Sequence, residues 1–191
     1  TFDGTLAGGT NDLNLTAGAG DISFNDTVSG MGTTTVASAA NVTAASTFGG
    51  ADYVQTTGTG ETDFQGAVTL SGNLDFNGTN LTISAAGNTV GGDMTVTNSG
   101  VYDQDGDIVV TGAFLQDDAA TGTNELGADL TAAGIEFDGA STLTAATVNM
   151  DSGGNALTFN STLAGGGNDL NLTAGAGDIL FGDTVSGMGT T

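Results

Sequence analysis

The residues best suited to chemistry in this sequence are three carboxylates within one short segment. Asp103, Asp105 and Asp107 alternate with a glutamine and a glycine. Hard oxygen ligands at alternate positions, with a glycine that allows a tight turn, suit Ca²⁺. The spacing is not that of an EF-hand loop, in which the glycine is the sixth residue. The segment therefore predicts a calcium site at 103–107, with a solvated Asp/Gly turn between strands as the alternative.

The side chains that most catalytic sites need are missing from the chain. None of its 191 residues is Lys, Arg, His, Cys, Pro or Trp. Ser-His-Asp and Cys-His arrangements, Schiff bases and arginine clamps therefore cannot form. A pair such as Asp103 and Asp105 could still serve a glycosidase, but 22 acidic residues make turn and surface carboxylates the better explanation. We expect no enzyme, and no cofactor other than calcium.

The charge of the chain restricts its partners. A net charge of −22 without a single Lys or Arg excludes nucleic acid and docking to anionic lipid. No apolar run approaches the roughly 20 residues of a membrane span. If coils stack about 4.8 Å apart, eight to nine of them carry about one charge per 2 Å, which is close to duplex DNA at about 1.7 Å. Such a polyanion predicts divalent cations as partners.

Alternation of apolar and polar residues recurs along the whole chain. It is clear in LNLTA from Leu13, AVTLSGNLDF from Ala67, MTVTN from Met94 and IEF from Ile135. β-Branched and aromatic residues dominate these runs, and Gly, Asn, Asp and Ser separate them, which is typical of short strands. No stretch has a convincing helical period. The chain is predicted to be all-β.

The first 34 residues return near the other end of the chain. Residues 1–34 and 158–191 differ at five positions, so that 29 are identical at a constant offset of 157. Internal repetition of this kind indicates a tandem array. We interpret 1–157 as one repeat unit and 158–191 as the start of the next copy, in a continuous fold without a linker.

A second, shorter period lies within the repeat. An aliphatic residue, any residue and a phenylalanine are followed by small or polar residues, and the phenylalanines at regular spacing are Phe2, Phe24, Phe114, Phe137, Phe159 and Phe181. Their spacing predicts a right-handed parallel β-helix of roughly 22 residues per coil, with about seven coils per repeat. Phe48, Phe64 and Phe76 break the rhythm, which indicates irregular coils or another face. Tandem β-sandwich domains are the alternative.

The segments NDLNLTAGAGDISF, ETDFQGAVTLSGNLDF and GAFLQDDAATGTNELGADLTAAGIEF resemble the Thr/Gly/Ala-rich repeats of very large bacterial surface proteins. These are the filamentous-haemagglutinin-like and autotransporter-type adhesins, whose passenger regions are right-handed β-helices. The resemblance implies an extracellular, fibrous and non-enzymatic protein. The chain departs from it in having no Lys or Arg, whereas related repeats commonly contain some.

Together these features predict a mechanical role at the cell surface. We expect a stiff spacer or filament shaft whose partners are neighbouring copies of the repeat, along the axis and laterally in a fibre or sheath. Two alternatives stay open. An adhesin would bind glycan or protein through exposed aromatic residues, for which Tyr53 and Tyr102 are the candidates. A self-assembling fibre subunit would instead stack end to end as separate short chains.

Overall fold

Alternation along each segment decides which side chains face the interior. In β9 (Leu74–Gly78), Leu74 and Phe76 are buried, whereas Asn77 is exposed. The structure, a computed structural model, describes residues 1–118 and 122–189. Every regular element in these residues is a β-strand, as predicted.

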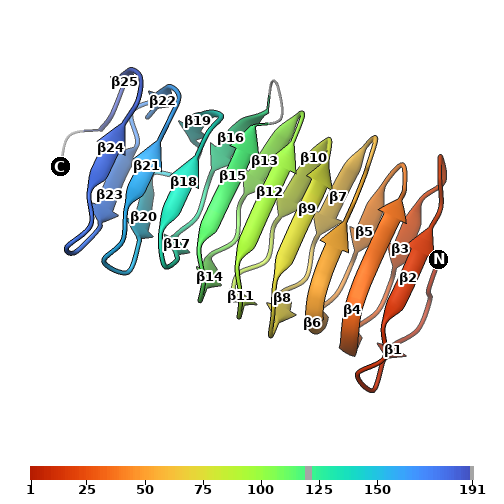
Figure 1. Ribbon diagram of the computed structural model, residues 1–191. Helices are drawn as coiled ribbons and strands as arrows, with labels where there is room; N and C mark the ends of the chain where they lie inside the picture. Colours follow the sequence, from red (N-terminus) through yellow and green to blue (C-terminus); the bar gives the residue numbers. More distant parts are fainter. Residues whose placement is uncertain (119–121, 190–191) are drawn as a thin grey trace.

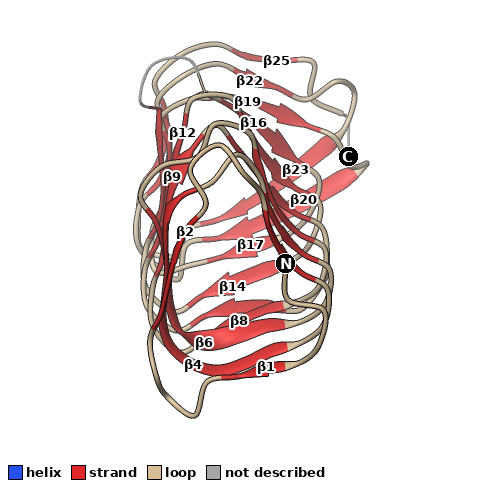
Figure 2. Cartoon of the chain, turned by 90° about the vertical axis from the view of Figure 1, so that its right-hand side faces the viewer, coloured by secondary structure: helices blue, strands red, loops and turns tan. Residues whose placement is uncertain are grey.

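The strands wind into a parallel β-solenoid of about nine coils (Figure 1). Each full coil contributes one strand to each of three faces, which we name A, B and C in chain order. Viewed from the N-terminal end, the strands surround a common interior (Figure 2). β4 and β6 run from face B into face C, so these two faces form one sixteen-stranded sheet, and face A forms a separate nine-stranded sheet.

The strands of each face follow in order along the chain. Face A consists of β3 (Ile22–Phe24), β5 (Val42–Ala44), β7 (Glu61–Phe64), β10 (Asn80–Ile83), β13 (Val101–Gln104), β16 (Thr123–Leu126), β19 (Ala140–Leu143), β22 (Leu163–Ala164) and β25 (Val185–Ser186). Face B consists of β1 (Leu6–Ala7), the first parts of β4 (Val28–Ser38) and β6 (Phe48–Gln55), β8 (Val68–Leu70), β11 (Asn88–Val90), β14 (Ile108–Val110), β17 (Leu130–Thr131), β20 (Thr147–Asp151) and β23 (Asp169–Thr173). Face C consists of β2 (Leu13–Thr16), the last parts of β4 and β6, β9, β12 (Met94–Asn98), β15 (Phe114–Asp118), β18 (Ile135–Phe137), β21 (Leu157–Phe159) and β24 (Ile179–Phe181).

The pairing register of the strands gives a shorter coil than the predicted 22 residues. Neighbouring coils are about 20 residues apart rather than 22. The longer spacing is found near the ends, where Leu6 pairs with Val28 and Leu163 with Val185, whereas Phe48 pairs with a residue 20 positions on. Every strand pairing in the described part of the chain is parallel, so the tandem β-sandwich alternative is wrong.

The irregular phenylalanines lie on different faces of one continuous core. Phe64 belongs to face A, Phe48 to face B and Phe76 to face C, and all three are buried. On face C, the inward column that contains Phe76 continues through Val96 and the buried Gln116 to the stacked rings of Phe137 and Phe159, whose centroids lie 5.2 Å apart at an interplanar angle of 11°. A mixed sequence spacing therefore produces one continuous, mainly apolar core.

The described residues contain no helix of the length and apolarity needed to cross a membrane.

Candidate functional site: the open C-terminal end and the acidic face A

The C-terminal end of the solenoid exposes large apolar side chains. Ile179, Leu180, Phe181 and Val185 are 41%, 49%, 46% and 40% exposed. They belong to β24 and β25, the last strands of faces C and A. Fully burying one such side chain contributes roughly 1.5–3 kcal/mol. A partner that covered this end would therefore stabilise it substantially.

The sequence repeat provides an internal comparison for this surface. The residues equivalent to Ile179, Phe181 and Val185 in the first copy are 157 positions earlier in the sequence. These three, an isoleucine, a phenylalanine and a valine, are only 6%, 1% and 1% exposed. The same local sequence is thus buried at one end of the chain and open at the other.

Strands β5 and β6 bury the first copy. The ring of Phe48 packs edge-on against Phe24, with 5.6 Å between ring centroids. The N–H of Ala45 donates to the carbonyl oxygen of Phe24 at 2.9 Å, and the N–H of Ile22 donates to the carbonyl oxygen of Asn41 at 2.9 Å. Residues 35–64 therefore show which contacts the repeated sequence makes when the next coils are present.

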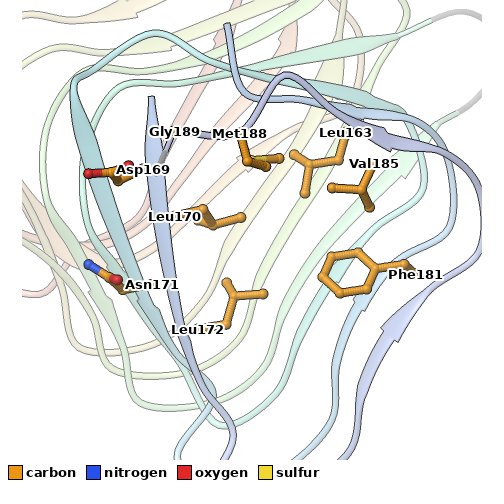
Figure 3. A pocket seen from close by; sticks show the side chains of 9 residues that line it. All are labelled: Leu163, Asp169, Leu170, Asn171, Leu172, Phe181, Val185, Met188 and Gly189. Atoms are coloured by element: carbon orange, nitrogen blue, oxygen red, sulfur yellow. The ribbon is translucent and has the colours of Figure 1, made fainter. Parts of the chain in front are cut away.

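The open end is hollowed between its strands (Figure 3). Leu170 and Leu172 of β23 point towards Phe181 and Val185 across a hollow of about 230 Å³. Asp169, next to Leu170 in the same strand, points away from this apolar interior. The hollow is the uncovered cross-section of the core, with a shape and lining that suit another coil.

The three predicted calcium ligands are not brought together. Asp103 lies on the outer surface of β13, and Asp105 and Asp107 are exposed in the turn that leads to β14. The Oδ1 atom of Asp107 accepts the N–H of Asp129 at 3.1 Å, so this carboxylate links two coils. Among residues 1–118 and 122–189, no three acidic side chains form a group that could hold a metal ion. These three carboxylates therefore do not form a metal-binding group in the described structure, and calcium binding in this turn stays a prediction.

Acidic side chains instead line the outer surface of face A. Asp103 lies between Thr82 and Glu125 of the neighbouring coils in the strand register. Partial burial, followed by repulsion from Asp105, Glu125 and Glu61, raises the pKa of Asp103 to about 6. Because the chain contains no Lys, Arg or His, nothing within it offsets this repulsion.

The prediction that Tyr53 and Tyr102 are exposed is wrong. Both side chains are fully buried, and burial raises the pKa of both phenols well above their ordinary value. The hydroxyl of Tyr53 donates to Oε1 of Gln55 at 2.7 Å, and the hydroxyl of Tyr102 to Oε1 of Gln104 at 3.3 Å. A Tyr-x-Gln pattern that occurs twice in the sequence could have revealed these buried pairs, because residues i and i+2 share one face of a strand.

Comparison with known proteins gives no identification. No family model, curated protein or solved structure matches the chain. Functional conclusions therefore depend on the geometry of the chain itself.

Sequence reasoning missed a set of Asp and Asn side chains at the corners between faces. The Oδ1 atom of Asp52 accepts the N–H of Asn73 at 2.8 Å, Asn73 accepts that of Asp93 at 2.9 Å, and Asp93 accepts that of Ala113 at 2.9 Å. A Cβ atom at Gly92 would collide with the amide oxygen of Asn73. A Gly-Asn or Gly-Asp dipeptide repeated one coil later is the signal that could have revealed this arrangement.

Other corners use the same hydrogen bond. A side-chain oxygen of one coil accepts a backbone N–H of the next in the pairs Asp12–Thr33, Asp21–Asn41, Asn41–Glu61, Asn80–Val101, Asp107–Asp129 and Asp129–Asn149. Many of the acidic residues therefore have a structural role, because they satisfy backbone groups where the strands end.

Proposed function

We propose that the chain is a load-bearing segment of a rod built from tandem copies of the 157-residue repeat, and that its role is that of a spacer or filament shaft. The observation that carries this proposal is the contrast between the two copies of the 34-residue sequence. Coils of the same solenoid bury the first copy, and the second presents the same apolar residues at the open end. A further copy would bury them in the same way.

The fold suits a mechanical role. Each coil is joined to the next by parallel ladders on three faces, by stacked apolar side chains and by the corner hydrogen bonds. A single coil cannot bury its own inner face, so stability comes from contacts between neighbouring coils. Lengthening the stack adds such contacts and leaves the number of open ends unchanged.

Composition supports an extracellular setting for this rod. Without Lys or Arg the chain offers no cleavage site to trypsin-like proteases, which favours a long-lived fibre at the cell surface. Its uncompensated carboxylates repel neighbouring rods at low ionic strength, and divalent cations reduce that repulsion. Lateral association into a sheath would therefore depend on divalent cations.

The two alternative functions are less well supported. The residues predicted to bind an adhesion partner, Tyr53 and Tyr102, are buried and cannot contact one. End-to-end assembly of separate chains would place the N-terminal coil of a second chain, with β1 and β2, on the open end. In a covalent tandem array the open end instead receives a copy of the segment that covers the first copy of the repeat.

Electron microscopy of engineered arrays tests the proposal. Further copies of residues 35–191 are added after residue 191, and the purified chains are imaged at low concentration. A continuous rod that lengthens by about 37 Å per copy is expected, from 157 residues at about 20 residues and 4.8 Å per coil. A matched array carrying Phe181→Asp should break at that junction. Compact beads joined by thin linkers in the unmodified array would contradict the proposal.

A further inference from the structure

Equivalent strands of the two sequence copies lie on different faces of the solenoid. β1 lies on face B and its equivalent β22 on face A. β2 lies on face C and its equivalent β23 on face B, and β3 lies on face A whereas β24 lies on face C. All three pairs therefore differ by one face in the same direction.

Local pairing is nevertheless the same in both copies. Leu6 pairs with Val28, and the residues 157 positions later, Leu163 and Val185, pair in the same register. The rings of Phe2 and Phe24 stack at 5.1 Å and 9°, and those of Phe159 and Phe181 at 5.8 Å and 7°. The copies thus form the same coil, and only its orientation about the axis differs.

The number of strands per repeat explains this difference. The strand numbering advances by twenty-one from β3 to β24, and two further strand positions arise because β4 and β6 each cross faces B and C. One repeat therefore spans twenty-three strand positions. At three positions per coil this equals seven and two-thirds coils, not the seven that a uniform 22-residue period predicts. Each repeat ends one face short of eight full coils.

We propose that the open C-terminal end is the docking surface for a further copy of residues 35–64, and that each copy of the repeat is turned by one face relative to the copy before it. The occupant is specified by the first copy, in which this segment covers the same sequence. The inference rests on the proposed tandem rod. The same sequence then returns to the same side of the rod only after three copies, or about 110 Å for twenty-three coils.

The turn matters because the faces differ chemically. The outward row on face B contains Thr69, Thr89, Val109 and Thr131, which are all exposed and uncharged, and it reaches a carboxylate only at Asp151. Face A carries the acidic column around Asp103 instead. In the array, neutral and acidic surfaces alternate along each side of the rod. A partner that recognises the neutral row meets it once in three copies on any one side.

Pairs of engineered cysteines test this rotation by one face between the two sequence copies, and the chain has no cysteine of its own. Ala164 neighbours Thr142 on face A. Without a turn, Ala164 would continue face B next to Asp151, as its equivalent Ala7 lies on that face. The variants are Thr142→Cys/Ala164→Cys and Asp151→Cys/Ala164→Cys, treated with a short thiol-specific cross-linker and analysed by mass spectrometry. The control is Asp151→Cys/Thr173→Cys, which joins true neighbours.

The outcomes separate the two proposals. Cross-linking of the 142/164 pair and of the control, with only background for the 151/164 pair, is expected. Cross-linking of the 151/164 pair would overturn the turn and leave the rod intact. If the control forms but neither 164 pair does, β23 continues the stack while β22 does not take the place on face A that the turn requires, and the turn is overturned. If the control fails as well, residues 158–191 do not continue the stack, and the proposed tandem rod fails.

An array labelled once per copy tests the same inference over a longer distance. A chain of at least four copies carries the change Thr89→Cys in every copy and is labelled with gold particles. Electron micrographs should show the particles moving to a different side of the rod with each copy. Particles that all lie along one side would refute the turn, whereas beads instead of a rod would refute the tandem array.

Discussion

Replacing Phe24 and, in a separate variant, Phe181 by alanine should have very different effects, although the two residues occupy equivalent positions in the repeat. Phe24 is fully buried between the rings of Phe2 and Phe48, at centroid distances of 5.1 and 5.6 Å. Its removal leaves a cavity, so a loss of about 3–5 kcal/mol in the free energy of unfolding is expected. Phe181 is nearly half exposed and stacks on Phe159 at 5.8 Å. Its loss should be about 1 kcal/mol.

Urea denaturation followed by circular dichroism measures both losses, with amide hydrogen exchange to locate the loosened coils. Measurements at several protein concentrations show whether a second molecule covers the end. A loss at Phe181 equal to that at Phe24, independent of concentration, would refute the reasoning. In a chain extended by a further copy of residues 35–191, the effect of Phe181→Ala should rise to that of Phe24→Ala, because the end is then buried.

Four further predictions follow from the polar groups. Since the pKa of Asp103 is raised from 3.8 to about 6 in the folded chain, the folded state binds this proton more tightly and loses stability as the pH rises through that window. Asp103→Asn should raise the melting temperature at pH 7 and leave it unchanged below about pH 4; a lower melting temperature at pH 7 would contradict this. Asn73→Ala should reduce the free energy of unfolding by about 1 kcal/mol in urea titrations, because the N–H of Asp93 loses its acceptor, whereas Asn73→Asp keeps the acceptor, adds repulsion from Asp52 and Asp93, and should return to the wild-type value at high salt. Gln55→Leu should cost about 1–3 kcal/mol because the buried hydroxyls of Tyr53 and Thr62 both lose the acceptor that they share, and adding Tyr53→Phe should recover part of the loss; no recovery would point to packing or to Thr62 instead. Ca²⁺ should raise the melting temperature more than Na⁺ at equal ionic strength, and equal effects would exclude a role for divalent cations.

The fold could be predicted because alternation is local. Leu74-Asp75-Phe76 shows its buried and outward positions in three residues, and the structure confirms a parallel solenoid built from such segments. The period was less accessible. The phenylalanines that indicate a period of 22 residues lie near the two ends. Phe48 and Phe64 lie on separate faces, and each pairs with a residue 20 positions earlier, Val28 and Ala44. Phenylalanine positions alone do not reveal which face each one occupies.

The candidate site could be predicted less well, because its features arise from contacts between coils. Tyr102 lies next to Asp103, and the polar neighbours Asp103 and Gln104 obscured the burial of the tyrosine. Asp103, Asp105 and Asp107 resemble metal ligands in sequence, but Asp103 lies on β13 and the other two in the turn that follows, and the three do not form a metal-binding group. The hydrogen bond from Asp129 to Asp107 joins residues 22 positions apart, and no local pattern specifies it.

The corner hydrogen bonds make the charge of the rod independent of its architecture. Asp52, Asn73 and Asp93 occupy successive levels of one corner and accept the same kind of bond through the same atom. Aspartate and asparagine can therefore make this bond equally well at Asn73 and Asp93, whereas Asp52 also accepts the hydroxyl of Thr33 through its second oxygen. A lineage could tune repulsion between fibres over a wide range by exchanging one for the other, while every coil kept its length and its register.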